Sequence, residues 1–177
     1  QVYLAFRYKA EDSSSCSRFD IYDLSVNEVS IVYPNKVTNL NFSNVSATQF
    51  DVNWTNPADF NSNWDGVLVF VTDNNTSLNL DQNNTNPASY TANTVYNQGT
   101  NGCVAKLTDG STSSVTVTGL TEGTTYYAYI YTYRAAENLV STEVSGNALA
   151  FSGYNSNDII ITEIMYNENS TDDEWIE

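Results

Sequence analysis

The sequence predicts an all-β fold, and its composition and its periodicity carry that prediction. Its 177 residues include 13 tyrosines, and aromatic residues make up 13% of the chain. Aromatic and β-branched side chains suit half-buried strands, whereas Ala, Leu and Lys, which favour helices, are scarce by comparison. Several short segments alternate apolar and polar residues with a period of two, as a strand with one buried face does. An apolar fraction of 41% is enough for a hydrophobic core.

The charge and the rare residue types exclude several classes of function. The formal net charge is −15, from 21 acidic and 6 basic residues, and histidine is absent. So few cations argue against nucleic-acid binding, and the lack of histidine removes the commonest general base and metal ligand. Two cysteines, Cys16 and Cys103, are too few and too far apart for a zinc site. The chain contains no run of about 18 apolar residues, which is the length that a membrane-spanning helix needs. We therefore predict no catalytic, cofactor-binding or metal-binding residues.

The N-terminal part contains two strand-like runs, at residues 2–8 (VYLAFRY) and 19–26 (FDIYDLSV), with a polar loop between them. Two strands alone are marginally stable in water, so we expect residues 1–30 to complete a sheet that begins further upstream. The segment 31–36 (IVYPNK) follows, and Pro34 marks it as a linker.

The middle of the chain reads as a complete set of short strands. After a first strand around residues 37–42, the run ATQFDVNWT places Phe50, Val52 and Trp54 on one face. A nearly continuous apolar strand (VLVFV), two alternating strands (SSVTVTGL and TTYYAYIYTYR) and a last strand within 140–149 follow. About seven short strands with turn residues between them predict an immunoglobulin-like β-sandwich.

These central segments resemble a fibronectin type III domain over residues 35–149. The resemblance rests on VTNLNFSNVSATQFDVNWTNP and, later, SVTVTGLTEGTTYYAYIY. The family keeps a tryptophan on its second strand, which Trp54 matches. It also keeps a Leu-x-Pro-Gly-Thr-x-Tyr corner, with Glu122 here in place of the proline, and the matching residues are Leu120, Gly123, Thr124 and Tyr126. The resemblance implies a self-contained sandwich with a buried Trp54.

Tyr126 supports the same fold independently of the family. It opens a late strand, which is where a tyrosine corner belongs. We expect its ring to fill the edge of the core and its hydroxyl to bond to backbone upstream.

Residues 73–112 form a predicted insertion in this domain, because they are too many for a bare loop. NQGTNG predicts a hairpin-like turn within the insertion. Apolar residues recur along it, namely Tyr90, Val95, Tyr96, Val104 and Leu107. One hypothesis is that the insertion projects from the domain and binds a ligand or partner. The hypothesis we favour is an elaborated edge hairpin that packs on the sandwich.

The strand TTYYAYIYTYR also predicts a row of outward tyrosines, namely Tyr127, Tyr129, Tyr131 and Tyr133. Exposed aromatic rings could bind a carbohydrate or a partner protein, because they bury much area at a low entropy cost. Alternatively, the insertion or a neighbouring domain covers them, or they are simply favourable cross-strand pairs.

The C-terminal segment resembles the start of a bacterial lamin-tail domain, another immunoglobulin-like sandwich. The resemblance rests on IIITEIMY and on the later run DDEWIE within residues 155–177. The N-terminal segment resembles the last two strands of jelly-roll modules of secreted bacterial adhesins. We therefore expect both ends to be cuts within a longer, modular chain.

The acidic residues and the cysteines leave further alternatives. A calcium site could form from the C-terminal acids, although a solvated acidic turn is the favoured interpretation; these acids are Asp172, Asp173, Glu174 and Glu177. Asp51 and Asp65 are expected at strand edges or outward positions, so neither suits glycoside hydrolysis. We do not expect Cys16 to pair with Cys103, because they lie in different predicted modules.

The sequence as a whole predicts a non-catalytic extracellular region of a secreted or surface bacterial multidomain protein. Spacing, adhesion, or protein or glycan binding is the role that the resemblances imply. The alternative is the accessory region of a secreted hydrolase, such as a nuclease, a peptidase or a polysaccharide-degrading enzyme, whose catalytic domain lies elsewhere. Fold-level resemblance alone does not decide between them.

Overall fold

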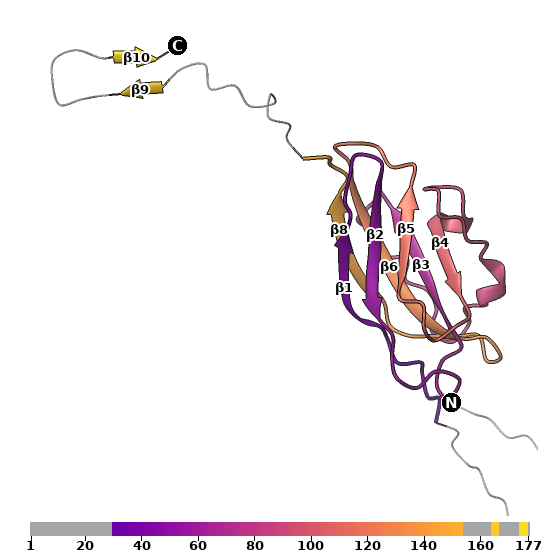
Figure 1. Cartoon of the computed structure of the whole chain (residues 1–177). Coiled ribbons are helices and arrows are strands. Elements are labelled where there is room, and N and C mark those ends of the chain that lie inside the picture. Colours follow the sequence, from indigo (N-terminus) through magenta and orange to yellow (C-terminus); the bar gives the residue numbers. More distant parts are fainter. Residues whose placement is uncertain (1–29, 154–163, 167–173, 177) are drawn as a thin grey trace, which may run out of the picture. The chain divides into compact units, whose positions relative to one another are not determined.

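The computed structural model describes residues 30–153, and the backbone of residues 164–166 and 174–176 (Figure 1). Between residues 30 and 153 it is built from strands and two single-turn 3₁₀ helices, which confirms the all-β prediction. In chain order these elements are β1 (Thr38–Ser43), β2 (Gln49–Thr55), β3 (Gly66–Thr72), η1 (Pro87–Ser89), η2 (Thr100–Gly102), β4 (Cys103–Leu107), β5 (Ser114–Thr118), β6 (Thr125–Arg134), β7 (Leu139–Val140) and β8 (Val144–Leu149).

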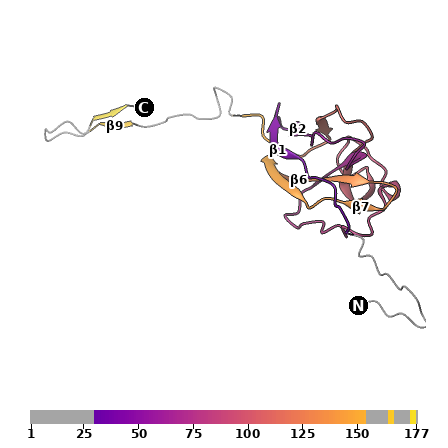
Figure 2. The ribbon, with the colours of Figure 1, turned by 90° about the horizontal axis from the view of Figure 1, so that it is seen from below.

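The strands form two antiparallel sheets (Figures 1 and 2). The first sheet has the order β1-β2-β5. In the second, β4 pairs with β3 and β3 pairs with β6, while β7 and β8 both pair with β6. Since β7 and β8 follow one another along β6, they act as one interrupted strand. The predicted immunoglobulin-like sandwich is confirmed.

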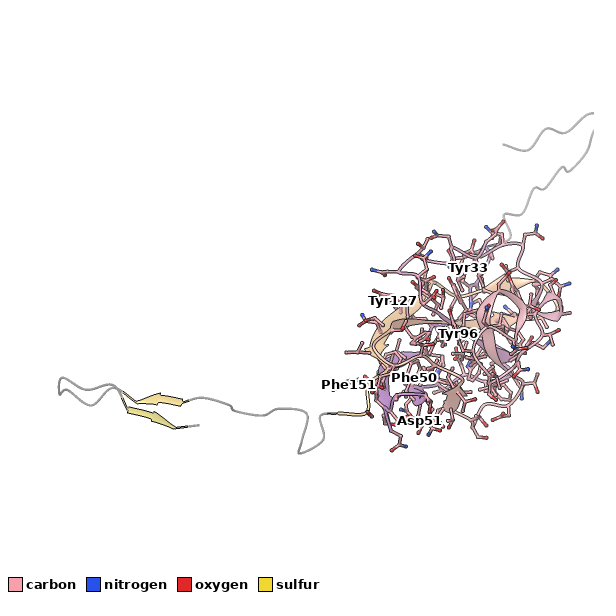
Figure 3. The ribbon with its side chains drawn as sticks, turned by 90° about the horizontal axis from the view of Figure 1, so that it is seen from above. Tyr33, Phe50, Asp51, Tyr96, Tyr127 and Phe151 are labelled. Atoms are coloured by element: carbon pink, nitrogen blue, oxygen red, sulfur yellow. The ribbon has the colours of Figure 1, made fainter. Side chains whose placement is uncertain are left out.

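The main core lies between the two sheets and follows the predicted alternation. Phe50 and Val52 are completely buried and Trp54 is 4% exposed, whereas Asp51 between them points to the outer face (Figure 3). The ring of Phe50 meets those of Phe42 and Tyr126 edge to face, with centroids 5.3 and 6.2 Å apart. Such pairs add stability beyond the area they bury.

The predicted tyrosine corner is present at the start of β6. Tyr126 is buried, and its hydroxyl oxygen accepts a hydrogen bond from the backbone N–H of Thr121 at 3.0 Å. Gly123 has a φ of 79°, a left-handed conformation that glycine adopts without strain. Its N–H donates to the carbonyl of Ala150 at 2.8 Å, so the turn is held without the proline that Glu122 replaces.

Residues 33–35 are attached to the sandwich. Pro34 is buried, and the Asn35 side chain donates to Asp59 at 2.7 Å. The buried hydroxyl of Thr132, on β6, donates to the Asn35 carbonyl at 2.7 Å. These bonds join the segment to both the β2–β3 connection and the centre of the second sheet.

Near the C-terminus, β9 (Ile164–Tyr166) and β10 (Glu174–Ile176) pair antiparallel, with Trp175 opposite Met165. These strands fall within residues 155–177, and the assignment of that stretch to the start of a lamin-tail domain stays a prediction. The two strand-like runs predicted within residues 1–29 lie outside the described residues. The calcium alternative also lies outside the described residues, because it depends on Asp172, Asp173, Glu177 and the side chain of Glu174. The expected lack of a disulfide lies outside them too, because it depends on Cys16.

Candidate functional site

The segment 73–102, which we call the strap, joins β3 to β4 and packs on the outer face of the second sheet. The strand β4, inside the predicted insertion 73–112, pairs antiparallel with β3. The insertion is therefore an elaborated hairpin that packs on the sandwich, as favoured from the sequence.

Residues 97–102, predicted as a hairpin-like turn, connect the strap to β4. A backbone bond joins the two sides of this connection, since the N–H of Asn93 donates to the carbonyl of Cys103 at 3.0 Å. Val95, however, bridges in parallel to Thr118 of β5, while β4 pairs with β3. The turn residues are a local signal, whereas the pairing partner of each side is chosen by the tertiary fold.

The prediction of an exposed tyrosine face is wrong. Tyr129, Tyr131 and Tyr133 are only 2–3% exposed, and Tyr127 is half-buried. They belong to a second hydrophobic cluster with Leu68, Phe70, Cys103 and Val140, and the strap covers it with Leu78, Leu80 and Tyr90. The alternative explanation, that the insertion covers these rings, is the one the structure confirms.

Hydrogen bonds fasten the strap across the whole second sheet. On one side, the carbonyl of Gln82 accepts from the N–H of Val140 at 3.1 Å, and Thr85 donates to the carbonyl of Asn138 at 2.9 Å. Towards the other side, the ammonium of Lys106 on β4 donates to the carbonyls of Pro87 and Tyr90, at 3.3 and 3.2 Å. The strap thus runs from the β7 side to the β4 side of the sheet.

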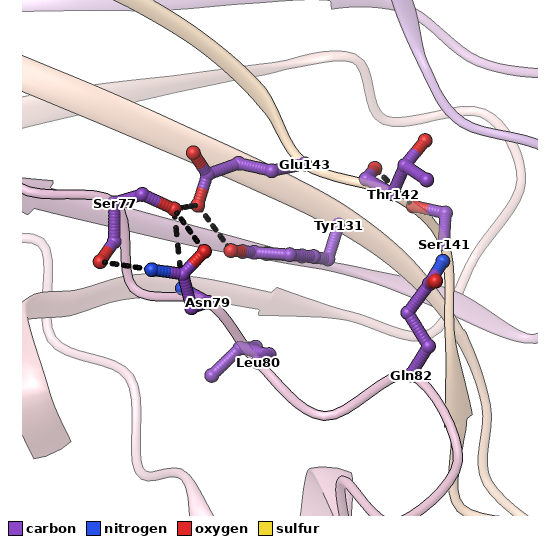
Figure 4. A pocket seen from close by; sticks show the side chains of 8 residues that line it. All are labelled: Ser77, Asn79, Leu80, Gln82, Tyr131, Ser141, Thr142 and Glu143. Carbon is purple, nitrogen blue, oxygen red and sulfur yellow. Dashed lines mark hydrogen bonds between the residues drawn. The ribbon is translucent and has the colours of Figure 1, made fainter.

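A pocket of about 190 Å³ opens where the strap meets the connection between β7 and β8 (Figure 4). It is lined by side chains from three segments. The strap supplies Ser77, Asn79, Leu80 and Gln82, β6 supplies Tyr131, and the β7–β8 connection supplies Ser141, Thr142 and Glu143. Most of these side chains end in hydroxyl or amide groups, so the pocket suits a polar ligand.

The carboxylate of Glu143 is the charged group of this pocket. Its Oε2 accepts hydrogen bonds from Ser77 Oγ at 2.8 Å and from the hydroxyl of Tyr131 (Figure 4). Burial, and then the bond to Glu143, raise the pKa of Tyr131 above its ordinary value, so the phenol keeps its proton and donates. Two neutral donors therefore hold one oxygen of the carboxylate in place.

Three other residues considered in the sequence analysis, Cys103, Asp51 and Asp65, have defined environments. Cys103 is a free, buried thiol whose pKa burial raises to about 11, so it carries little thiolate at neutral pH. Asp51 lies on the outer face of β2, as expected, and accepts from Asn44 and Thr116 at 2.6 Å each. Asp65 accepts from the N–H of Ala135 at 2.7 Å, in agreement with an outward position.

Two negative findings apply to the described part of the chain. It contains no group of three His, Cys, Asp or Glu side chains that could hold a metal ion. Within the same residues, no helix has the length and hydropathy needed to cross a membrane.

Two antiparallel sheets around a buried tryptophan, with a tyrosine corner at the start of β6, define an immunoglobulin-like sandwich. The family model of the fibronectin type III domain matches residues 35–147. The chain therefore belongs to the fibronectin type III family. Domains of this family are generally non-catalytic modules, often found in multidomain proteins and often mediating protein interactions.

A comparison with solved structures finds several similar chains. A two-domain fibronectin type III segment from chicken tenascin is 18% identical, over 64% of this chain and 48% of that one, with a TM-score of 0.42. The fn3 domain of the human collagen alpha-1(XX) chain is 17% identical, over 74% and 98%, with a TM-score of 0.43. A redesigned β-sandwich protein is 23% identical, over 66% and 94%, with a TM-score of 0.45. A search of the curated proteins finds no match to this sequence.

Proposed function

We propose that this chain is a non-catalytic, extracellular region of a secreted or surface-exposed bacterial multidomain protein, and that it serves as a spacer and in adhesion. The observation that carries this proposal is the path of the chain through the sandwich. The segment before β1 enters at one end, and the segment after β8 leaves at the opposite end (Figure 1). A domain with this geometry can be joined in series with others and adds its length to the chain.

The flanking segments support a modular parent protein. Residues 1–30 are assigned to the end of a jelly-roll-like module, residues 31–36 to a linker, and residues 155–177 to the start of a lamin-tail-like domain. Residues 35–149 are then the central domain, with its insertion at 73–112. The net charge of −15 supports the spacer role, because strong like charge keeps a protein soluble and monomeric.

Adhesion is assigned to protein contact rather than to sugar stacking on tyrosines. Tyr129, Tyr131 and Tyr133 are covered by the strap, so they offer no aromatic platform to a carbohydrate. Protein interactions are common for fibronectin type III domains, and the pocket at Glu143 is a polar recess on the covered face.

Protease shaving of intact cells that produce the parent protein tests the location. An antibody against residues 35–147 should detect peptides released from the cell surface or protein in the medium. A cytoplasmic control protein should stay intact. Recovery of the antigen only after lysis would contradict the proposal.

Activity assays on the purified chain test the non-catalytic role. We expect no turnover of polysaccharide, peptide or nucleic acid above the buffer control. Turnover that copurifies with the chain and is lost on its denaturation would contradict the proposal and favour an enzymatic role. The two tests are independent, because an extracellular enzyme would pass the first and fail the second.

A further inference from the structure

We propose that the pocket at Glu143 binds one cationic side chain, Lys or Arg, of a partner protein. This inference deepens the proposed adhesive role and rests on it. It goes further by assigning the contact to a defined recess and to one chemical class of ligand group.

The geometry of Glu143 is the first argument. Both hydrogen bonds that described residues make to this carboxylate, from Ser77 and Tyr131, end on Oε2. Oε1 points away from the two hydroxyl donors (Figure 4). Because the side chain is already held, a ligand that bonds to Oε1 orders little more of the protein, and preorganisation of this kind favours binding.

The lack of an internal counter-ion is the second argument. None of the eight side chains that line the pocket is cationic. Among the described residues an ion pair joins Arg134 and Glu137, and neither of these residues lines the pocket. A guanidinium or ammonium group would complete the pocket, since hydrogen bonds between ionised partners are about twice as strong as neutral ones.

The lining fits a long, basic side chain in its other parts too. Asn79, Gln82 and Thr142 add amide and hydroxyl groups to the lining, and these can form hydrogen bonds with neighbouring polar groups of the partner. Leu80 and the ring of Tyr131 supply apolar surface for the methylene stem. At about 190 Å³ the pocket is smaller than the roughly 300–1,000 Å³ of typical small-molecule sites, which suits one side chain.

The charge of the molecule adds to this preference. A net charge of −15 attracts cationic partners over a distance and accelerates their encounter. The same field acts weakly on a neutral sugar. Among polar ligands, the pocket and the whole chain therefore both favour a cation.

Chemical-shift titration of the ¹⁵N-labelled full chain with capped tripeptides tests the proposal. The probes are Gly-Arg-Gly and Gly-Lys-Gly, with Gly-citrulline-Gly as the neutral analogue of the arginine peptide and methyl glucoside as a neutral sugar. We expect saturable shifts at residues 77–82 and 141–143 with the two basic peptides. The citrulline peptide and the glucoside should not saturate at these residues.

Two matched variants separate a local contact from general charge attraction. Glu143→Gln should weaken binding of the arginine peptide by about tenfold or more, because a charge-assisted hydrogen bond is lost. Glu137→Gln removes the same charge from an exposed turn and should leave the affinity unchanged. Both variants should give the dispersed spectrum of the folded parent.

A third variant covers the case in which Glu143→Gln fails to fold. Gln82→Lys keeps the carboxylate and places a tethered ammonium at the pocket, so it should block the added arginine peptide. Three results would overturn the proposal: unsaturable shifts spread over the surface, equal affinity of Glu143→Gln or Gln82→Lys and the parent, or saturable binding of the glucoside at the same residues. The last result would leave an adhesive role standing while assigning the pocket to carbohydrate.

Discussion

Trp54 shows how a single side chain connects distant parts of this domain. Its ring fills the main core, and its Nε1–H donates to Asn56 Oδ1 at 2.6 Å. The amide nitrogen of Asn56 donates in turn to the carbonyls of Gly110 and Thr112, at 3.2 and 2.8 Å. The tryptophan therefore combines apolar burial with a polar link to the turn before β5.

Replacing Trp54 with Ala should lower the free energy of unfolding by about 3–5 kcal/mol, as large aromatic deletions in cores do. Trp54→Phe, which keeps most of the apolar volume and loses only the N–H, should cost clearly less. Urea denaturation followed by circular dichroism measures both. An unchanged midpoint for Trp54→Ala would contradict the place of this residue in the core.

Tyr126→Phe should destabilise the domain by about 0.5–1.5 kcal/mol, the typical net worth of one hydrogen bond. The hydroxyl accepts from the N–H of Thr121, and the substitution leaves that donor without its partner. Tyr127→Phe, at the half-buried neighbouring position, is the control and should have little effect. Equal stabilities of the two variants in the same denaturation experiment would count against the tyrosine corner.

Stability should fall at alkaline pH, and Tyr131 should contribute to that fall. Burial and the bond to Glu143 raise its folded-state pKa, whereas in the unfolded chain it titrates near the ordinary value of about 10. Above about pH 10 the unfolded chain loses the proton first, so it binds fewer protons and the free energy of unfolding decreases as pH rises. Below that pH the contribution of Tyr131 is fully present.

Urea denaturation at several values from about pH 8 to 11 measures this dependence. Tyr131→Phe should flatten the alkaline slope, because the group that titrates differently in the two states is removed. A slope unaffected by Tyr131→Phe would show that other groups account for the decrease.

At the scale of the elements, the strap gives the second sheet a core of its own. β3 is buried on both faces, with Val67, Val69 and Val71 in the main core and Leu68 and Phe70 in the cluster beneath the strap. The rings of Phe70 and Tyr90 pack edge to face with centroids 5.2 Å apart. The domain therefore has three layers where a plain sandwich has two.

Leu80→Ser should loosen the strap without unfolding the sandwich, because Leu80 packs on the second cluster and makes no part of the main core. Native-state hydrogen exchange should show faster exchange of the strap amides that bond to the sheet, such as that of Thr85. Amides of β2 and β5 should keep their protection. Val95→Ser, at an exposed strap position, is the control. Equal loss of protection in the strap, in β2 and in β5 would mean that the strap and the sandwich unfold as one unit.

At the scale of the whole molecule, the strap also shields the sheet edges on one side. The N–H of Asn93 donates to the carbonyl of Cys103 in β4 at 3.0 Å. At β5, Tyr96 donates to the carbonyl of Thr118 at 2.8 Å, and Thr118 donates to that of Thr94 at 2.9 Å. Since unpaired edges invite pairing with other chains, these bonds protect the domain against aggregation.

Residues 31–153 should fold as an autonomous unit, because both hydrophobic clusters are built within that range. A chain trimmed to it should unfold in one cooperative transition with the same urea midpoint as the full chain. Circular dichroism and tryptophan fluorescence should report coincident curves. A clearly lower midpoint of the trimmed chain would show that the flanking segments stabilise the domain.

The sequence predicted the strands and the main core well, and it missed the site. Period-two alternation identified the buried face of β2, and the corner residues identified Tyr126. The pocket could not be predicted, because Ser77 and Glu143 are 66 positions apart and neither belongs to a recognisable motif. The sequence nevertheless contained a signal that the outer face of the second sheet is covered by another segment. The unbroken apolar run of residues 67–71 is typical of a strand buried on both faces.

What the sequence by itself determined is the sandwich of the fibronectin type III family. Its determinants are local, because alternation within a strand and the residue types at a tight corner act over a few positions of the chain. They can be recognised without knowing which distant segments pack against them. Only the tertiary structure decided that Tyr129, Tyr131 and Tyr133 are covered and that Glu143 lines a pocket. Alternation states which side chains share a face, but whether that face meets water or another segment depends on contacts between distant parts of the chain.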